Sequence, residues 1–250
     1  MKALPYALTH SQQQAVDDII ADLARPQRML RLLQGDVGSG KTVVALIAAA
    51  TVIEAGRQAA FMAPTEILAR QHLKTIAPLA EAAGIRVAIL TGRERGGERE
   101  SLLDRLTLGD VDLLIGTHAL FQEDVAFHDL ALAIVDEQHR FGVHQRLALA
   151  QKGEAVDVLV LTATPIPRTL VLTYFGDMDI SELREKPPGR QPIDTRAIQL
   201  SRIAEVEEAV GRAMREGQRA YWVCPLVEDS EKIDLAAAEA RFEELRAKFG

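Results

Sequence analysis

The sequence has 250 residues, 48% hydrophobic and 26% charged, which is enough for one large globular domain or two smaller ones. Its 36 acidic and 29 basic residues give a net charge of −7, which argues against a protein that coats duplex DNA by bulk positive charge. The single cysteine, Cys224, excludes an internal disulfide framework, and we expect it to be a small buried residue on a strand.

Membrane association is not expected. The first residues include a lysine but no apolar run of the kind found in a secretory signal. The longest apolar stretch, Val43–Ile53, is shorter than the roughly 20 residues that a bilayer-spanning helix needs. We therefore expect a soluble protein of the cytoplasm.

Along the chain, helical and strand patterns alternate. The first helix is predicted to start at a capping box formed by Thr9 and Gln12 and to stop before Pro26. Apolar strands are then predicted at residues 29–33, 59–63, 87–90, 111–115, 132–135 and 158–161, and helices at 42–55, 67–83 and 99–108. Such alternation is typical of an α/β fold with a mostly parallel sheet flanked by helices.

A change in amino-acid composition marks a predicted domain boundary. Residues 186–192 are rich in proline and charge, which is typical of a linker, so we expect a first domain over residues 1–185. Residues 193–250 are predicted to contain strands at 193–198 and 220–223 and helices at 203–215 and 235–249. That makes little more than one βαβ unit, too short for a complete second domain.

The strongest chemical signal is Gly35-Asp-Val-Gly-Ser-Gly-Lys-Thr42, which matches the P-loop pattern between a predicted strand and a predicted helix. Its Gly35, Gly38, Ser39 and Gly40 let backbone N–H groups turn toward a phosphate at the positive end of the helix. Lys41 would reach the β- and γ-phosphates, and the hydroxyl of Thr42 would bind Mg²⁺. The sequence therefore predicts ATP and Mg²⁺ as ligands.

Two acidic residues, Asp136 and Glu137, follow the strand predicted at 132–135. Ligands bind at this edge of open α/β sheets. Asp136 could hold Mg²⁺, and Glu137 could orient and deprotonate an attacking water.

Gln12 has two readings. Its amide could cap the first helix, or it could recognise adenine, since one amide both donates and accepts hydrogen bonds. The two roles are only partly compatible, because a side chain bound to its own helix cap is less available to a base.

Hydroxyls and glycines follow several other predicted strands. Each could be an ordinary turn or cap, but together they would line a single rim of the sheet. These residues are Thr65, Thr91, Gly92, Thr117, Thr162 and Thr164.

In motif order the chain resembles the superfamily 2 helicases, and its longer strings are similar to the RecG family of branch-remodelling DNA helicases. These strings are Asp136-Glu-Gln-His-Arg-Phe-Gly-Val143, Thr162-Ala-Thr-Pro-Ile-Pro-Arg-Thr-Leu170, Tyr174-Phe-Gly-Asp-Met-Asp179 and Tyr221-Trp-Val-Cys-Pro-Leu226. The transcription–repair coupling translocases share part of this pattern and are the alternative, although Gln138-His139 favours RecG.

The resemblance implies a RecA-like P-loop domain over residues 1–185, a partial second RecA-like domain over 193–250, and remodelling of branched DNA in recombination and repair. It implies that Gln12 reads adenine, that Asp136 and Glu137 are the metal ligand and base, and that Lys41 is catalytic. Nucleotide state would be coupled to DNA by Thr162, Thr164 and Arg168, and phosphate-backbone contacts would come from Thr65, Gln71, Thr91, Gly92 and Thr117.

The sequence departs from the family in two respects. The family's N-terminal wedge domain, which engages the branch point, has no counterpart in these residues. They also contain no Q-x-x-G-R-x-G-R string, which in the family supplies the second-domain arginine of the ATPase site. We expect both to belong to the rest of a longer protein. An arginine finger contributes about 10³–10⁵ in rate in related enzymes, so the alternative function for this polypeptide is a nucleotide-binding module with negligible turnover.

Overall fold

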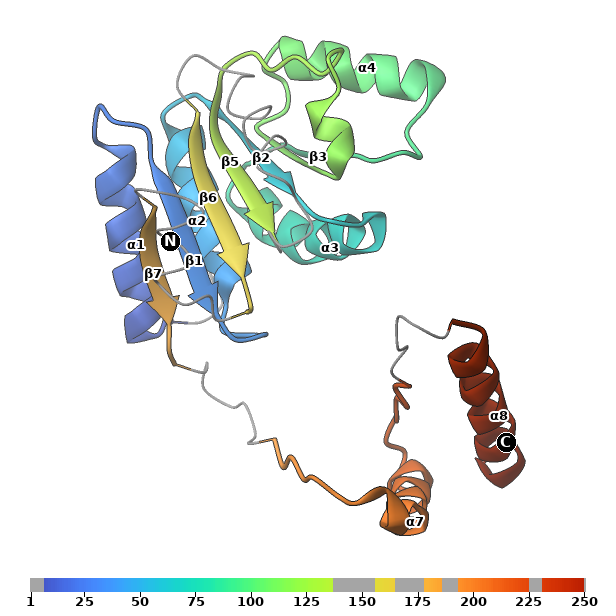
Figure 1. Ribbon diagram of the computed structural model, residues 1–250. Coiled ribbons are helices and arrows are strands. Elements are labelled where there is room, and N and C mark those ends of the chain that lie inside the picture. Colours follow the sequence, from blue (N-terminus) through green and yellow to red (C-terminus); the bar gives the residue numbers. More distant parts are fainter. Residues whose placement is uncertain (1–6, 137–155, 165–177, 186–192, 225–230, 250) are drawn as a thin grey trace. The chain divides into compact units, whose positions relative to one another are not determined.

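The computed structural model describes residues 7–136, 156–164, 178–185, 193–224 and 231–249 (Figure 1). The chain divides into two compact units, Met1–Arg190 and Gln191–Gly250. None of the helices in the described ranges is sufficiently long and apolar to cross a membrane.

The first unit is built on a seven-stranded sheet in the order β3-β4-β2-β5-β6-β1-β7. All the strand pairs within the described residues are parallel, as predicted. The strands are β1 (Leu30–Gly35), β2 (Gln58–Met62), β3 (Val87–Leu90), β4 (Leu113–Gly116), β5 (Leu130–Asp136), β6 (Asp157–Thr162) and β7 (Asp179–Leu183). Every residue of β2, β4 and β5 is buried, because these central strands are covered on both faces.

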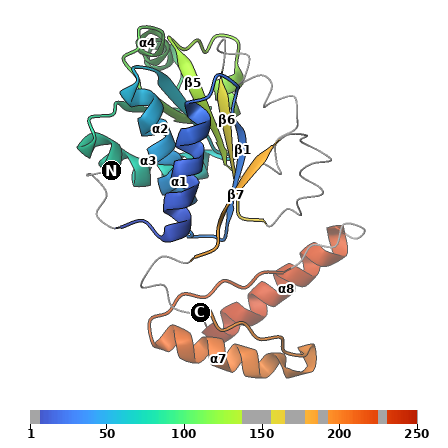
Figure 2. The ribbon, with the colours of Figure 1, turned by 90° about the vertical axis from the view of Figure 1, so that its left-hand side faces the viewer.

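Helices cover both faces of this sheet. α1 (His10–Leu23), α2 (Lys41–Glu54) and α3 (Glu66–Ala82) pack on one face, where they share a core cluster with alternate residues of the strands (Figure 2). α4 (Gly96–Thr107) and the 3₁₀ helix η1 (His118–Phe121) belong to the cluster on the opposite face. This is the α/β sheet with flanking helices that the sequence predicts.

The edge strand β7 is not predicted by the sequence. Among the residues that the structure describes, it pairs only with β1, and two of its five residues, Asp179 and Glu182, are exposed acids. Charged residues are typical of edge strands, because they discourage pairing with a further strand. Because these acidic residues interrupt the apolar pattern, hydrophobic periodicity alone does not predict this strand.

The second unit differs from the prediction. The helix expected at 203–215 is present as α7 (Ile203–Arg215), and the last helix, α8 (Glu231–Phe249), begins four residues before its predicted start. The strands expected at 193–198 and 220–223 are wrong: neither segment joins a sheet in the described part of the chain, and Tyr221 is 89% exposed. Cys224 is likewise exposed instead of buried. A β-rich segment becomes a strand only where another strand supplies its hydrogen bonds.

Polar contacts join the two helices of this unit. Glu207 on α7 accepts ion pairs from Arg241, at 3.0 Å, and from Lys248, at 2.7 Å, both on α8. The guanidinium of Arg241 also lies 4.9 Å from the ring centre of Trp222.

Candidate nucleotide-binding site

The P-loop lies between β1 and α2, as predicted. Gly38 and Gly40 have φ angles of 76° and 91°, in the left-handed region that glycine adopts without strain. Gly40 is the residue before α2, and as a glycine it makes no side-chain cap to this helix end. The first N–H groups of α2 are therefore oriented toward the strand-end edge of the sheet, the arrangement that binds a phosphate.

Two polar side chains of the loop are suited to an anion. Nζ of Lys41 donates to the carbonyl oxygens of Gly35 and Asp36, at 2.6 and 3.1 Å. Oγ of Ser39 is buried and has no hydrogen-bond partner within the described residues. A buried hydroxyl without a partner is costly, so a ligand that supplied an acceptor here would be stabilised.

Gln12 anchors this loop to α1. Its Oε1 accepts from the backbone N–H of Thr9 at 2.9 Å, which confirms the predicted capping box. Its Nε2 donates to the carbonyl oxygen of Ser39 at 2.7 Å, a contact that the sequence does not reveal. Both ends of the amide thus make a hydrogen bond within the protein, although each end retains capacity for one more.

Asp136, the last residue of β5, lies at the same edge. The register pairs Asp136 with Leu161 on β6, and Thr162 with Gln34 on β1, so the ends of β5, β6 and β1 are adjacent. Asp136 is buried, and its Oδ2 lies 2.7 Å from Nε2 of His72, a residue that sequence reasoning missed. Glu137 and Arg168 lie outside the described residues.

Thr162 and Thr164 form a local turn at the end of β6. The backbone N–H of Thr164 donates to Oγ1 of Thr162 at 3.1 Å. Thr162 is fully buried, whereas Thr164 is exposed at the edge. We call the residues at the ends of β1, β5 and β6 the nucleotide half of the rim: Gly35–Thr42, Asp136, Thr162 and Thr164.

The donor set fits Mg²⁺. The hydroxyl of Thr42 and the carboxylate of Asp136 are hard oxygen ligands, and no cluster of three or more histidine, cysteine or acidic side chains occurs in the described ranges. Mg²⁺ is usually held by one or two carboxylates together with substrate phosphates, and not by a cage made entirely of protein groups. Thr42 and Asp136 would supply the protein's share of such a site.

The other half of the rim follows β2, β3 and β4, which are also neighbours. Thr65 caps α3 by accepting from the N–H of Leu68 at 3.3 Å. Thr91 and Thr117 are buried, whereas Gly92 and Gln71 are exposed. We call Thr65, Thr91, Gly92, Glu94 and Thr117 the charged half of the rim.

Glu94 is the reason for this name. Its Oε2 accepts from the backbone N–H and the hydroxyl of Thr91, at 2.6 and 2.7 Å, and its Oε1 accepts from Arg70 at 3.0 Å. Partial burial raises the pKa of Glu94, but the hydrogen bonds from Thr91 and Arg70 outweigh it, so the pKa lies below its ordinary value. The two donors of Thr91 expected to contact a phosphate are therefore occupied by an ionised carboxylate.

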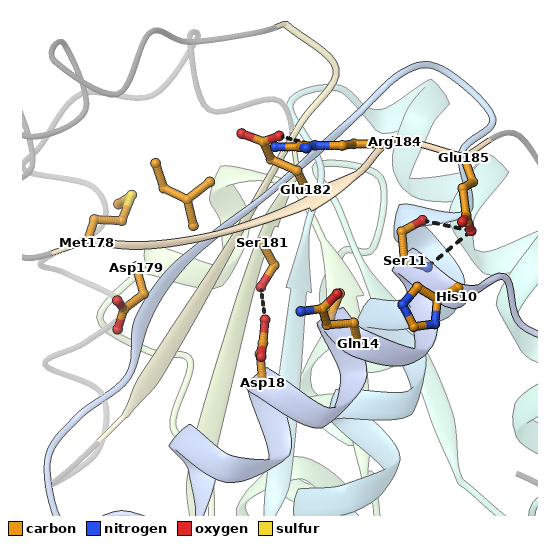
Figure 3. A pocket seen from close by; sticks show the side chains of 12 residues that line it. His10, Ser11, Gln14, Asp18, Met178, Asp179, Ser181, Glu182, Arg184 and Glu185 are labelled. Atoms are coloured by element: carbon orange, nitrogen blue, oxygen red, sulfur yellow. Dashed lines mark hydrogen bonds and ion pairs between the residues drawn. The ribbon is translucent and has the colours of Figure 1, made fainter.

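The described residues also line a cavity away from the P-loop. A groove of about 590 Å³ runs between α1 and β7, where Ser181 donates to Asp18 and Glu185 accepts from Ser11 (Figure 3). Its lining includes four acidic residues, Asp18, Asp179, Glu182 and Glu185, which would repel a phosphate. A smaller cavity of about 230 Å³ borders the start of the P-loop at Gly35 and Asp36.

Comparison with known proteins identifies the family. The model of the DEAD/DEAH box helicases matches residues 9–172, from the capping box of α1 to beyond β6. The chain belongs to the DEAD/DEAH box helicase family. Membership agrees with the strand–P-loop–helix geometry and with the acidic end of β5.

Within the DEAD/DEAH box helicases, the chain is similar to RecG proteins. It is 51% identical over 248 residues to the ATP-dependent DNA helicase RecG of Pasteurella multocida, a match that covers 97% of this chain and 36% of the relative. The RecG of Bacillus subtilis is 49% identical over 238 residues, covering 95% of this chain and 35% of the relative. A solved structure of RecG bound to a three-way DNA junction has a TM-score of 0.80 and 43% identity, and covers 96% of this chain and 32% of that one. The chain thus spans about a third of the length of these relatives.

Proposed function

We propose that the chain is the ATP-binding part of a RecG-type DNA motor, which couples Mg²⁺-dependent ATP hydrolysis to the remodelling of branched DNA. The observation that carries this proposal is the placement of the P-loop and Asp136 at the same edge of one parallel sheet, at the ends of β1 and β5, which flank β6. The similarity to RecG supports the choice of DNA motor over other DEAD/DEAH box helicases.

In this proposal the residues of the nucleotide half divide the work. Lys41 leaves the carbonyls of Gly35 and Asp36 for the β- and γ-phosphates, because an anion is a better partner for an ammonium than a neutral carbonyl. Thr42 and Asp136 hold Mg²⁺, which, when bound, neutralises charge that develops on the transferred phosphoryl group. Glu137 orients and deprotonates the attacking water.

Residues along the rim would couple the nucleotide state to DNA. Thr162, Thr164 and Arg168 would transmit nucleotide state, and Thr65, Gln71, Thr91, Gly92 and Thr117 would contact the phosphate backbone. Such contacts position a strand without reading its bases. The RecG relative of known structure binds a three-way junction, and we propose branched DNA as the partner here as well.

We further propose that residues 193–250 begin a second RecA-like domain. The amphipathic helix α7 supports this reading, since its partly buried Ile203, Val206 and Val210 recur at helical spacing.

Nucleotide binding is the first test. Titration calorimetry with Mg²⁺ and a non-hydrolysable ATP analogue should give an affinity that falls about 100-fold or more in Lys41→Ala, because a charge-assisted phosphate contact is lost. Lys74→Ala, at an exposed lysine of α3, is the matched control and should bind as the parent does. Equal affinity in the parent and Lys41→Ala, with both folded by circular dichroism, would refute the nucleotide-binding role.

A further inference from the structure

His72 lies on the core-facing stripe of α3. Ala69, Ile76 and Ala80 on this helix are buried, and His72 falls on the same face at helical spacing. Its side chain is only 14% exposed. A polar ring in such a stripe needs a partner, because a buried donor without one is costly.

The partner of His72 is Asp136. The distance from Nε2 of His72 to Oδ2 of Asp136 is 2.7 Å, within the range of a short charge-assisted hydrogen bond. A carboxylate oxygen accepts hydrogen bonds, so in this pair the tautomer of His72 with the hydrogen on Nε2 is the one that donates. One oxygen of Asp136 is therefore held in a fixed direction.

The ring of His72 is itself held. Its centre lies 4.6 Å from the ring centre of Phe61 on β2, with the two planes tilted by 48°. Phe61 is 1% exposed and belongs to the main core cluster, so it forms a rigid wall. His72 is thus fixed by β2 on one side and by the end of β5 on the other.

Resting on the nucleotide-binding function proposed above, we propose that His72 is a positioning residue for the Mg²⁺ site. By holding Oδ2 of Asp136, it would leave the second carboxylate oxygen available to a bound Mg²⁺. Carboxylates that bind metals are themselves hydrogen-bonded, and loss of such a supporting partner typically costs about 10–100-fold in metal affinity. His72 contacts neither nucleotide nor metal and acts only through Asp136.

The competing role is purely structural: a core histidine that stabilises the packing of α3. Two substitutions separate the roles. His72→Leu fills much of the same space without a donor, whereas His72→Gln places an amide N–H where Nε2 lies. A structural role predicts that both variants alter unfolding and neither alters the metal dependence of nucleotide binding.

The experiment measures binding of a non-hydrolysable ATP analogue as a function of Mg²⁺ concentration, and again in EDTA. In His72→Leu the half-saturating Mg²⁺ concentration should rise about 10–100-fold, while affinity in EDTA stays at the parent value. His72→Gln should recover at least part of the loss. His128→Leu, at an exposed histidine, is the control and should leave Mg²⁺ dependence unchanged.

A half-saturating Mg²⁺ concentration in folded His72→Leu within about twofold of the parent overturns the proposal. If His72→Leu does not fold, His72→Phe replaces it, since an aromatic ring preserves the contact with Phe61. If neither donorless variant folds, His72 serves stability alone and the proposal is equally overturned. A parent chain that binds the analogue no better with Mg²⁺ than with EDTA would instead contradict the proposed Mg²⁺–ATP function itself.

Discussion

The two halves of the rim differ in their capacity to bind an anion. In the nucleotide half, Gly38 and Gly40 shape a loop whose backbone donors lead into an uncapped helix, and the buried hydroxyl of Ser39 has no hydrogen-bond partner in the described residues. In the charged half, both donors of Thr91 already serve the carboxylate of Glu94, which Arg70 also binds. One half has capacity for a phosphate, whereas the other already holds an internal anion.

We therefore expect the two halves to bind phosphate groups with different affinities. A nucleotide that enters the P-loop gains hydrogen bonds that the protein alone does not make, so its binding is expected to be strong. A DNA phosphate at Thr91 must replace Glu94, so its net gain is the difference between two anions. If the proposed DNA contacts form in this half, we expect them to be weak and sensitive to salt.

The largest loss of nucleotide affinity is expected from Gly40→Ala. A Cβ at this position would overlap Nε2 of Gln12, and the φ angle of 91° disfavours any side chain. Analogue affinity should fall about 100-fold or more, measured by calorimetry. Gly56→Ala is the matched control, because its φ is 81° but nothing lies within 4 Å of the added Cβ. It should cost about 1 kcal/mol of stability and leave binding intact.

A smaller effect is expected from Gln12→Ala. Losing the bond to Ser39 should loosen the P-loop and weaken binding of ATP and GTP alike by roughly tenfold, since both share the phosphates. Competition titrations with the two nucleotides measure this, with Gln14→Ala at an exposed site of α1 as the control. A loss confined to ATP would instead favour the reading in which Gln12 leaves its cap to recognise adenine.

The smallest effect tests the charged half. Glu94→Gln removes an ionised carboxylate from Thr91 and should raise the affinity for single-stranded DNA about two- to fivefold at low salt. Fluorescence anisotropy measures the change, and Glu98→Gln, an exposed acid in the first turn of α4, is the control. Equal gains in both variants would show only general charge repulsion, and a decrease would mean that Glu94 shapes the loop for DNA.

The residues of the nucleotide half were largely predictable because their signals are local in sequence. A P-loop needs glycines at fixed spacing before a helix, and a capping box needs Thr9 and Gln12 three residues apart. The contacts that complete the site were not predictable, because they join distant residues: Gln12 with Ser39, and His72 with Asp136. A histidine in an amphipathic helix carries no local mark of its partner 64 residues away.

Prediction was poorest where strand formation depended on neighbours. The edge strand β7 forms despite its acids because β1 offers a partner, with Leu33 opposite Ser181. Residues 220–223, although rich in strand-forming side chains, form no ladder in the described part of the second unit.

By itself, the sequence determined the alternation of strands and helices, the parallel sheet and the phosphate-binding loop. Hydrophobic periodicity and glycine placement act over a few residues, so they can be read along the chain. Only the tertiary structure decided which donors of the rim are already occupied and which carboxylate oxygen is held. Hydrogen bonds between distant segments exist only after the core has packed, because packing alone brings α1 to the P-loop and α3 to the end of β5.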